Sequence, residues 1–389
     1  MRVAKYFGSI LVAICVVNLW GTHANVARAD DDEGRIPRFK VDPFWPKPLP
    51  HDPATGKPWV TGEVAGTCVD SHNHIFTVNR GNLIAPEDVI AVASPPVLEF
   101  DREGNVVNAW GNRNVLPNGL HGCFVDFQDN VWIAGNGDGI VQKYTHDGRT
   151  LLLQIGTRGH CDSPTGACGN PGSNSSRVFL NQPANMTIDP GNGDIYIADG
   201  YGNHRVVVFN RSGVYLRQWG NSGLGPGQFQ PGDGGHPHCI VMSRAGLLYA
   251  CDRGSDRIQV FEKNPTRCTG TPPDRVCQPL RIITVVPGRG QNTAGSAWDV
   301  SFSKDREQTF MFDVDGGDEV LWIFDHAAGT ILAGFGRPGH QAGEFTFLHS
   351  IVLDSDSNMF LGETIGGRRV QKFVPVEGNG EGEGGDDQH

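Results

Sequence analysis

The sequence predicts an all-β fold, a six-bladed β-propeller that occupies residues 59–375. The first observation is an internal repeat with a period of roughly 45–65 residues, in or a little above the range of propeller blades. Six copies fit between Trp59 and Pro375. The second is composition: 53 glycines and 25 prolines suit a chain with many tight turns. No amphipathic pattern of three helical turns is visible, so almost no helix is expected.

Each repeat contains three short strands separated by polar turns, and most repeats add a fourth. The third strand of each copy ends in an aromatic residue: VLEF (97–100), VQKY (141–144), VVVF (206–209), IQVF (258–261), LWIF (321–324) and VQKF (370–373). A fourth run often ends in glycine: NAWG (108–111), LQIG (153–156), RQWG (217–220) and AGFG (333–336). Because a propeller blade is a four-stranded sheet, one repeat accounts for one blade.

Residues 1–29 have the features of a signal peptide. Arg2 and Lys5 give a positive start, and the apolar run 7–20 is short for a bilayer span. Residues 27–29, Ala-Arg-Ala, match an A-x-A cleavage site. The alternative is an uncleaved anchor. Cleavage predicts a mature chain that has no membrane span and is secreted or periplasmic.

Residues 30–58 are expected to form an N-terminal extension that packs on the propeller. The last repeat ends soon after Phe373, one strand short of a blade. We expect the proline-rich stretch 37–59 to supply that strand and so close the ring, which removes an open sheet edge. Residues 376–389 contain a glycine-rich acidic run and are predicted to be a disordered tail.

Eight cysteines remain once Cys15 is removed with the signal peptide, and an oxidising compartment favours disulfides. A bridge between Cys239 and Cys251 across a hairpin is a less favoured alternative. Cys68 and Cys123 are expected to be core residues. Two pairs are each expected to close their own loop: Cys161 with Cys168, and Cys268 with Cys277.

The charge of the chain indicates which classes of partner to expect. The formal net charge is −11 at pH 7, and no basic patch is interleaved with aromatic residues. Nucleic acid is therefore not expected as a partner. We expect a monomer that acts on a small-molecule or peptide substrate carrying a carboxylate.

Histidine occupies one equivalent position in every second repeat. Alternate blades of a closed six-bladed ring lie about 120° apart, so three such imidazoles converge on the axis. Three histidines that leave a fourth position open are typical of a catalytic zinc site. The alternative is unrelated surface histidines, since the chain has 14. The aligned position, at the start of the first strand, holds in chain order Ala65, His121, Ala184, His238, Trp298 and His349.

Three further side chains lie on turns that face the same rim as these histidines. Arg80 and Arg253 could hold an anionic substrate, because a guanidinium binds a carboxylate in a bidentate fork. Tyr201 could act as a base beside a metal. The alternatives are an ion pair of either arginine with Asp199 or Asp252, and a half-buried turn aromatic for the tyrosine.

These residues lie in stretches that resemble the NHL-repeat six-bladed propellers, and among them the peptidyl-α-hydroxyglycine α-amidating lyases. The resemblance covers most of residues 59–375. It is carried by ADGYGNHRVVVFNRSGVYLRQWG (198–220), HPHCIVMS (236–243), LHSIVLDSDSNMFLGE (348–363) and LPNGLHGCFVD (116–126).

The resemblance implies a role for each candidate residue. His121, His238 and His349 match the histidines that bind zinc in the family. Tyr201 matches the proposed catalytic base, Arg80 the arginine at the substrate hydroxyl, and Arg253 a second active-site arginine. The implied reaction converts a peptidyl-α-hydroxyglycine into a peptide amide and glyoxylate.

The sequence departs from the family at several positions. The family holds a structural calcium ion with an aspartate directly after the third histidine, and that residue is Ser350 here. The family's disulfide positions are Gly202 with Asn181 and Tyr249 with Val260, so other cysteines must bridge this chain. Two other functions stay open. One is a non-catalytic NHL propeller that binds a protein or glycan, and the other is a zinc propeller enzyme for a different small anionic substrate.

Overall fold

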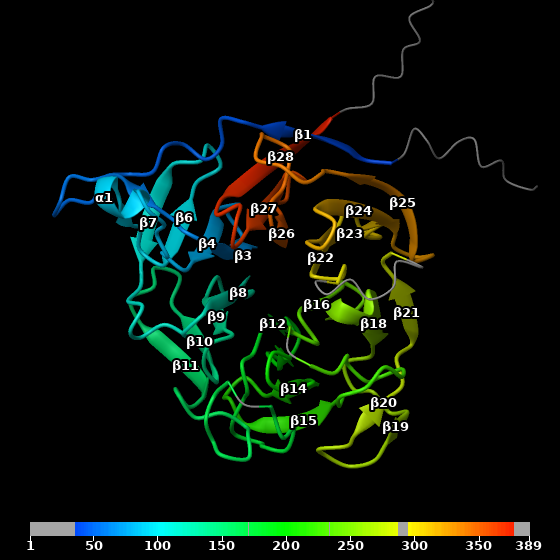
Figure 1. Ribbon diagram of the computed structural model, residues 1–389. Coiled ribbons are helices and arrows are strands. Elements are labelled where there is room, and N and C mark those ends of the chain that lie inside the picture. Colours follow the sequence, from blue (N-terminus) through cyan, green and yellow to red (C-terminus); the bar gives the residue numbers. More distant parts are fainter. Residues whose placement is uncertain (1–35, 170, 233, 287–294, 377–389) are drawn as a thin grey trace, which may run out of the picture. The chain divides into compact units, whose positions relative to one another are not determined.

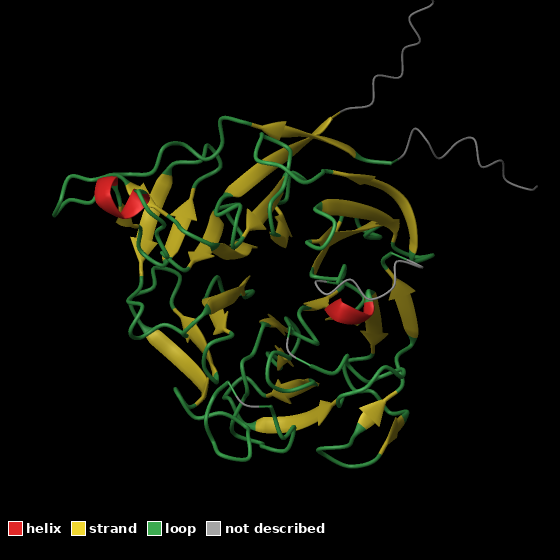
Figure 2. Cartoon of the chain, in the orientation of Figure 1, coloured by secondary structure: helices red, strands yellow, loops and turns green. Residues whose placement is uncertain are grey.

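Six four-stranded sheets surround a common axis in the computed structural model of the protein (Figure 1). The structure describes residues 36–376 except 170, 233 and 287–294, and residues 37–376 belong to one compact unit. Helix in this part of the chain is limited to α1 (Glu87–Ile90) and the 3₁₀ turn η2 (Arg253–Ser255), as Figure 2 shows. The predicted six-bladed all-β fold is confirmed. The predicted signal peptide and most of the predicted tail lie outside the described residues.

The strands of each blade follow one another from the axis outwards, and the last blade also contains the first strand of the chain. The first three blades consist of β3 (Val64–Val69), β4 (Ile75–Asn79), β6 (Val97–Phe100) and β7 (Val106–Trp110); β8 (Leu120–Val125), β9 (Val131–Gly135), β10 (Ile140–Tyr144) and β11 (Leu151–Gly156); and β12 (Asn185–Ile188), β13 (Ile195–Asp199), β14 (Arg205–Phe209) and β15 (Tyr215–Trp219). The other three consist of β16 (Ile240–Met242), β17 (Leu248–Asp252), β18 (Arg257–Phe261) and β21 (Arg281–Thr284); β22 (Asp299–Phe302), β23 (Phe310–Asp315), β24 (Val320–Asp325) and β25 (Thr330–Phe335); and β26 (Leu348–Leu353), β27 (Met359–Glu363), β28 (Val370–Val376) and β1 (Arg38–Asp42). Two short pairs lie outside the blades: β2 (Trp59–Val60) with β5 (Val92–Ala93), and β19 (Cys268–Thr269) with β20 (Val276–Cys277).

The extension closes the ring, as the sequence predicts. β1 pairs antiparallel with β28, from Arg38 opposite Val376 to Asp42 opposite Lys372. Phe39 of β1 also contacts the fifth blade, with ring centroids 5.8 Å from Phe312 and 6.0 Å from Phe335. The N-terminal strand therefore completes the last blade and packs across to the blade before it.

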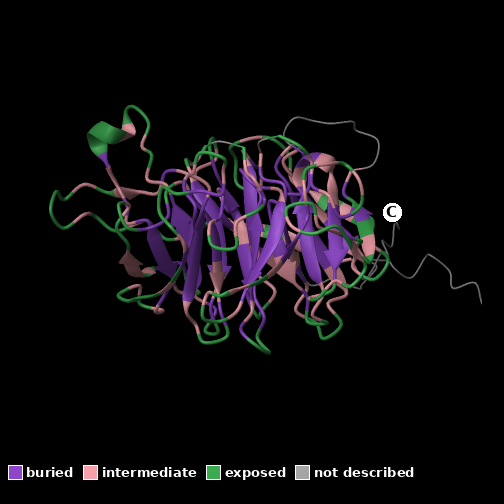
Figure 3. Cartoon of the chain, turned by 90° about the horizontal axis from the view of Figure 1, so that it is seen from below, coloured by how far each residue is buried: buried purple, intermediate pink, exposed green. Residues whose placement is uncertain are grey.

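Apolar side chains are buried between neighbouring blades. Trp219 of the third blade, for example, packs on Phe261 of the fourth at 5.6 Å between ring centroids. Seen from the side, the strands are mostly buried and the connecting loops are exposed (Figure 3). Close packing of this kind tolerates little change in spacing, so it fixes the distance from each blade to the next.

The structure pairs all eight cysteines of the described chain. The two predicted loop bridges are present, and so is the less favoured one. The prediction for Cys68 and Cys123 is wrong in part: both are buried, but they form a disulfide between β3 and β8, with Cα atoms 5.5 Å apart. The packing of two adjacent blades brings them together, and local sequence spacing gives no sign of it. Among the described helices, none combines the length and the apolar character that a bilayer span requires.

Candidate metal centre

The three histidines from alternate blades meet at the axis. The ring centroid of His121 lies 4.8 Å from that of His238 and 4.6 Å from that of His349, and the latter two are 5.0 Å apart. One nitrogen from each ring lies within 4.8 Å of the other two. All three side chains are buried. The structure thus contains a possible metal-binding site of three imidazoles.

Irregular pairing at the start of two inner strands directs His121 and His349 towards the axis. The β8–β9 ladder skips His121 and Gly122, and the β26–β27 ladder skips His349. Such bulges redirect a side chain out of the regular alternation of a strand. Glycine permits the tight contact between blades here, because a Cβ on Gly122 would lie 2.6 Å from the carbonyl oxygen of Ala184.

Each imidazole donates its Nδ1–H to a carbonyl of the next blade. His121 donates to Ala184 at 2.8 Å, and His238 donates to Trp298 at 2.7 Å. His349 donates to Ala65 at 2.7 Å. The three acceptors occupy the positions that align with the histidines in the intervening repeats. These bonds hold Nδ1 in the protonated form and leave Nε2 as the nitrogen with a free lone pair.

The surroundings keep the imidazoles neutral. Burial, together with the charges of Arg80 and Arg253, lowers the pKa of His349 to about 3. Burial, followed by nearby cationic groups, also lowers the pKa of His121 and His238 well below the ordinary value. The Nε2 atom of His238 is buried and has no hydrogen-bond partner. Neutral imidazoles with unprotonated Nε2 atoms suit a divalent zinc ion.

Tyr201 lies beside the imidazoles, in the turn after β13. Its hydroxyl is 3.0 Å from Nε2 of His121, so it donates to the nitrogen that a metal would use. Its ring centroid is 5.8 Å from that of His238. The predicted base therefore lies next to the predicted ligands.

Arg253 carries a cationic group that no carboxylate neutralises among the described residues. Its guanidinium stacks on Trp298 at 4.3 Å from the ring centroid and lies 6.0 Å from that of Tyr201. Its Nε is buried and has no hydrogen-bond partner. Nδ1 of His236 accepts the backbone N–H of Gly254 at 3.2 Å and so braces this turn. The sequence gives Trp298 no role, although its alignment with the histidines places it at the axis.

Arg80 is close to the imidazoles but is already paired. Its Nη1 lies 2.5 Å from Oε2 of Glu63, and its Nε donates to the carbonyl of Leu120 at 3.1 Å. Burial of Glu63 raises its pKa, but the ion pair with Arg80 and the hydrogen bonds it accepts outweigh this and lower it. The sequence does not indicate Glu63, because nothing in its own repeat marks it as a partner.

Asp199 and Asp252 pair with other arginines, so the alternative ion pairs for Arg80 and Arg253 are wrong. The Nε of Arg205 lies 2.9 Å from Asp199, and the Nε of Arg257 lies 2.7 Å from Asp252. In both cases the acid ends the second strand of its blade and the arginine begins the third. These pairs hold the turns that carry Tyr201 and Arg253.

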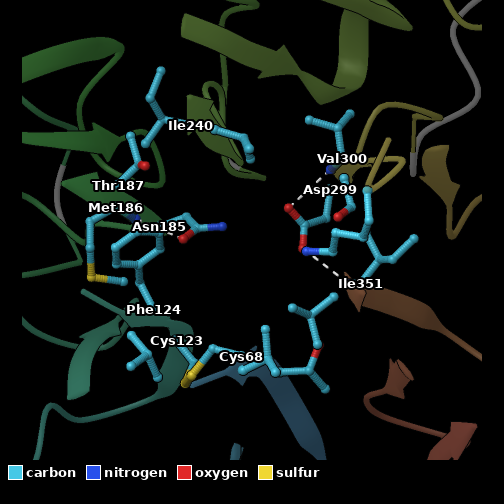
Figure 4. A pocket seen from close by; sticks show the side chains of 17 residues that line it. Cys68, Cys123, Phe124, Asn185, Met186, Thr187, Ile240, Asp299, Val300 and Ile351 are labelled. Carbon is cyan, nitrogen blue, oxygen red and sulfur yellow. Dashed lines mark hydrogen bonds between the residues drawn. A yellow bond between two sulfur atoms is a disulfide. The ribbon is translucent and has the colours of Figure 1, made fainter. Parts of the chain in front are cut away.

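A cavity of about 260 Å³ continues along the axis beyond the histidines. Asn185 and Asp299 point into it from opposite sides (Figure 4). Asp299 accepts the backbone N–H groups of Val300 and Ile351, and burial raises its pKa to about 7. Ser350, at the family's calcium position, accepts a hydrogen bond from Thr67 at 3.2 Å. The carboxylate that lines this cavity therefore comes from Asp299 of the fifth blade, and the sequence does not single out this residue.

Comparison with known proteins supports the resemblance. The model of the NHL repeat matches residues 180–209, which include β12, β13 and β14. NHL repeat-containing protein 3 of Mus musculus is 24% identical over 357 residues, which cover 87% of this chain and 85% of that protein. Peptidyl-alpha-hydroxyglycine alpha-amidating lyase 1 of Drosophila melanogaster is 31% identical over 203 residues, which cover 50% of this chain and 33% of that protein.

A solved structure agrees with the fold. A gluconolactonase from Xanthomonas campestris superposes with a TM-score of 0.51 at 15% identity, over 88% of this chain and 98% of that chain. At this identity the likeness concerns the fold alone. The chain is a six-bladed β-propeller that contains an NHL repeat and is homologous to NHL repeat-containing protein 3 and to the hydroxyglycine amidating lyases.

Proposed function

We propose that the protein is a metal-dependent lyase that cleaves the C–N bond of a peptidyl-α-hydroxyglycine or a related α-hydroxy amide. The observation that carries this proposal is the placement of Tyr201 and Arg253, whose guanidinium no described carboxylate neutralises, beside three neutral, inward-facing imidazoles. Homology to hydroxyglycine amidating lyases supports the reaction class. The four disulfides support an oxidising, exported location, as proposed from the sequence.

The reaction needs one proton to move from oxygen to nitrogen. The substrate hydroxyl loses a proton, the C–N bond breaks as the C=O bond of glyoxylate forms, and the amide nitrogen gains a proton. His121, His238 and His349 would hold a zinc ion, which when bound supplies a Lewis acid that favours ionisation of the hydroxyl. Tyr201, in its phenolate form, takes the hydroxyl proton as a general base, and this is the proton that the amide nitrogen then gains.

The arginines orient the substrate. Arg253 binds the carboxylate that becomes part of glyoxylate, since its guanidinium has no carboxylate partner of its own among the described residues. Trp298 fixes the plane of that guanidinium from one side. Arg80 contributes positive charge near the substrate hydroxyl, and Glu63 holds it in place.

Incubation of the purified protein with α-hydroxyhippurate and a colorimetric assay for glyoxylate test the proposal. We expect zinc-dependent release of glyoxylate that His121→Ala abolishes and His160→Ala, in an exposed loop, preserves. If the zinc-loaded protein releases no more glyoxylate than His121→Ala, the lyase assignment is wrong. Loss of one zinc ion per chain in His121→Ala would then favour an enzyme for another anionic substrate, and equal zinc content in the two proteins would favour a binding propeller.

A further inference from the structure

A second cluster of metal-ligating side chains lies at the opposite end of the blades from the axial histidines. We propose that Asp70, His74, Glu99 and His146 bind a divalent transition metal ion that joins the first blade to the second. Asp70 and His74 belong to the turn that follows the far end of β3, and Glu99 lies on β6. His146 comes from the turn between β10 and β11 of the second blade.

Three of the donor atoms, from Asp70, Glu99 and His146, lie within 4.8 Å of one another, and Nδ1 of His74 lies close to both carboxylates. Oδ2 of Asp70 is 2.9 Å from Nε2 of His146 and 3.9 Å from Nδ1 of His74. Oε1 of Glu99 is 2.7 Å from the same atom of His74 and 4.0 Å from that of His146. These four distances bracket the edge of about 3.3 Å expected of a tetrahedron with zinc–ligand bonds of 2.0–2.1 Å. To reach that edge, the Asp70–His146 and His74–Glu99 distances must lengthen, and the other two distances must shorten.

The donors are held in place and can be reached from solvent. Oδ1 of Asp70 accepts the backbone N–H groups of His72 and His74, which leaves Oδ2 directed into the cluster. The Asp70 side chain is fully buried, whereas those of His74 and His146 are 32% and 36% exposed. Two imidazoles and two carboxylates form a donor set that suits zinc.

At the equivalent position between the third and fourth blades, a simple ion pair joins the two blades. In the third and fourth blades, Asp189 occupies the place of Asp70, and Lys263 occupies the place of His146, two residues beyond the aromatic end of the third strand. Nζ of Lys263 lies 2.6 Å from Asp189. One carboxylate and one ammonium suffice there. The cluster in the first two blades adds a second carboxylate and a second imidazole, and a shared metal ion accounts for both.

Zinc stoichiometry separates this site from the axial one. The chelator-stripped full chain is reloaded with ZnCl₂ at pH 7.5, dialysed, and measured by elemental analysis. We expect two zinc ions per chain in the wild type and one in His146→Lys, which restores the ion pair seen at Lys263. His160→Ala should keep two, because this exposed side chain belongs to neither cluster.

A second measurement uses chains without the axial site. In His238→Ala we expect one zinc ion per chain and a higher unfolding temperature when zinc is added. In the double variant His238→Ala/His146→Lys we expect no bound zinc and no change in unfolding temperature. The proposal is overturned if His146→Lys binds as much zinc as the wild type while remaining folded. Failure of the lyase proposal would appear differently, as unchanged zinc content without release of glyoxylate.

Discussion

His121, His238 and His349 each donate Nδ1–H to a carbonyl of the following blade, and this bond determines which nitrogen is left to bind a metal. The same buried setting that orients the rings also makes their protonated forms unfavourable. At the scale of single residues, the centre is therefore defined by hydrogen bonds to the main chain and by charge, in addition to the identity of the ligands.

Replacement of Tyr201 by phenylalanine tests its role as the base. We expect kcat for glyoxylate release to fall by about 10²- to 10⁴-fold, the usual contribution of a general base. Zinc content should not change, because the hydroxyl is not a ligand in the proposal. Tyr215→Phe, on an outer strand, is the matched control. A Tyr201→Phe enzyme with the kcat of the wild type would exclude this role.

Replacement of Arg253 by glutamine tests carboxylate binding. A hydrogen bond to a charged group contributes about 1.5–3 kcal/mol, so KM should rise by about 10- to 100-fold. The increase should disappear for a substrate whose carboxylate is esterified. Arg102→Gln, at an exposed ion pair with Asp356, should leave KM unchanged. An equal rise in KM for acid and ester would show that Arg253 does not bind the carboxylate.

The lowered pKa of His349 predicts an acid-sensitive apoprotein. The unfolded chain takes up a proton on this residue below its ordinary pKa of 6.5, whereas the folded chain does so only near pH 3. The folded state therefore loses stability as the pH falls from 6.5 towards 3. We expect the unfolding temperature of the metal-free protein to fall less steeply between pH 6.5 and pH 5 in His349→Gln. His160→Gln should retain the slope of the wild type, and equal slopes in all three proteins would contradict the argument.

At the scale of elements, the loop that precedes β16 sets the distance between Tyr201 and His238. Gly235 lies in this loop with a φ of 78°. A Cβ there would be 2.7 Å from Cδ2 of His238 and 3.0 Å from the Tyr201 ring. The loop therefore passes close to both side chains because it has no side chain of its own at this point.

Gly235→Ala should impair the centre more than the fold. Gly159→Ala is the matched control, because Gly159 has a φ of 70° and open space around it. Each of the two variants places a side chain in the left-handed region, which should lower the free energy of unfolding by about 1 kcal/mol. Only Gly235→Ala should also reduce zinc affinity and glyoxylate release. Urea unfolding and zinc titration of the two variants make the comparison. Similar zinc affinity in both would show that the loop has room to move.

The elements that carry the histidines could be predicted because they repeat. Strand patterns recur in the same order in each repeat, so the alignment of His121 with His238 and His349 follows from the sequence. The acceptor carbonyls, Glu63 and the Cys68–Cys123 disulfide could not be predicted in the same way. They depend on which residues of neighbouring blades come into contact, and no spacing within one repeat encodes that.

For the whole molecule, closure of the ring depends on the N-terminal strand. Phe39 of β1 packs on the fifth blade while its backbone completes the sixth. The need for such a strand could be predicted from the missing fourth strand, whereas its contact with the fifth blade could not.

Phe39→Ala should weaken closure measurably. Loss of this partly buried ring should lower the free energy of unfolding by about 1–2 kcal/mol, the range for apolar burial of this size. Phe44→Ala, at a side chain that is 76% exposed, should have little effect. Urea unfolding of the two variants decides the matter, and equal stabilities would show that the contact with the fifth blade contributes nothing.

The pairing of Arg38 with Val376 has a practical consequence. β26 starts at the histidine end of its blade, and two reversals of direction bring β28 to finish at the far end, where β1 begins. The two ends of the propeller thus emerge side by side, on the side away from Tyr201. A tag, a tether or a fused protein at either end would leave the approach to the three imidazoles open, so the molecule could be anchored to a solid support with its reactive side facing the solution.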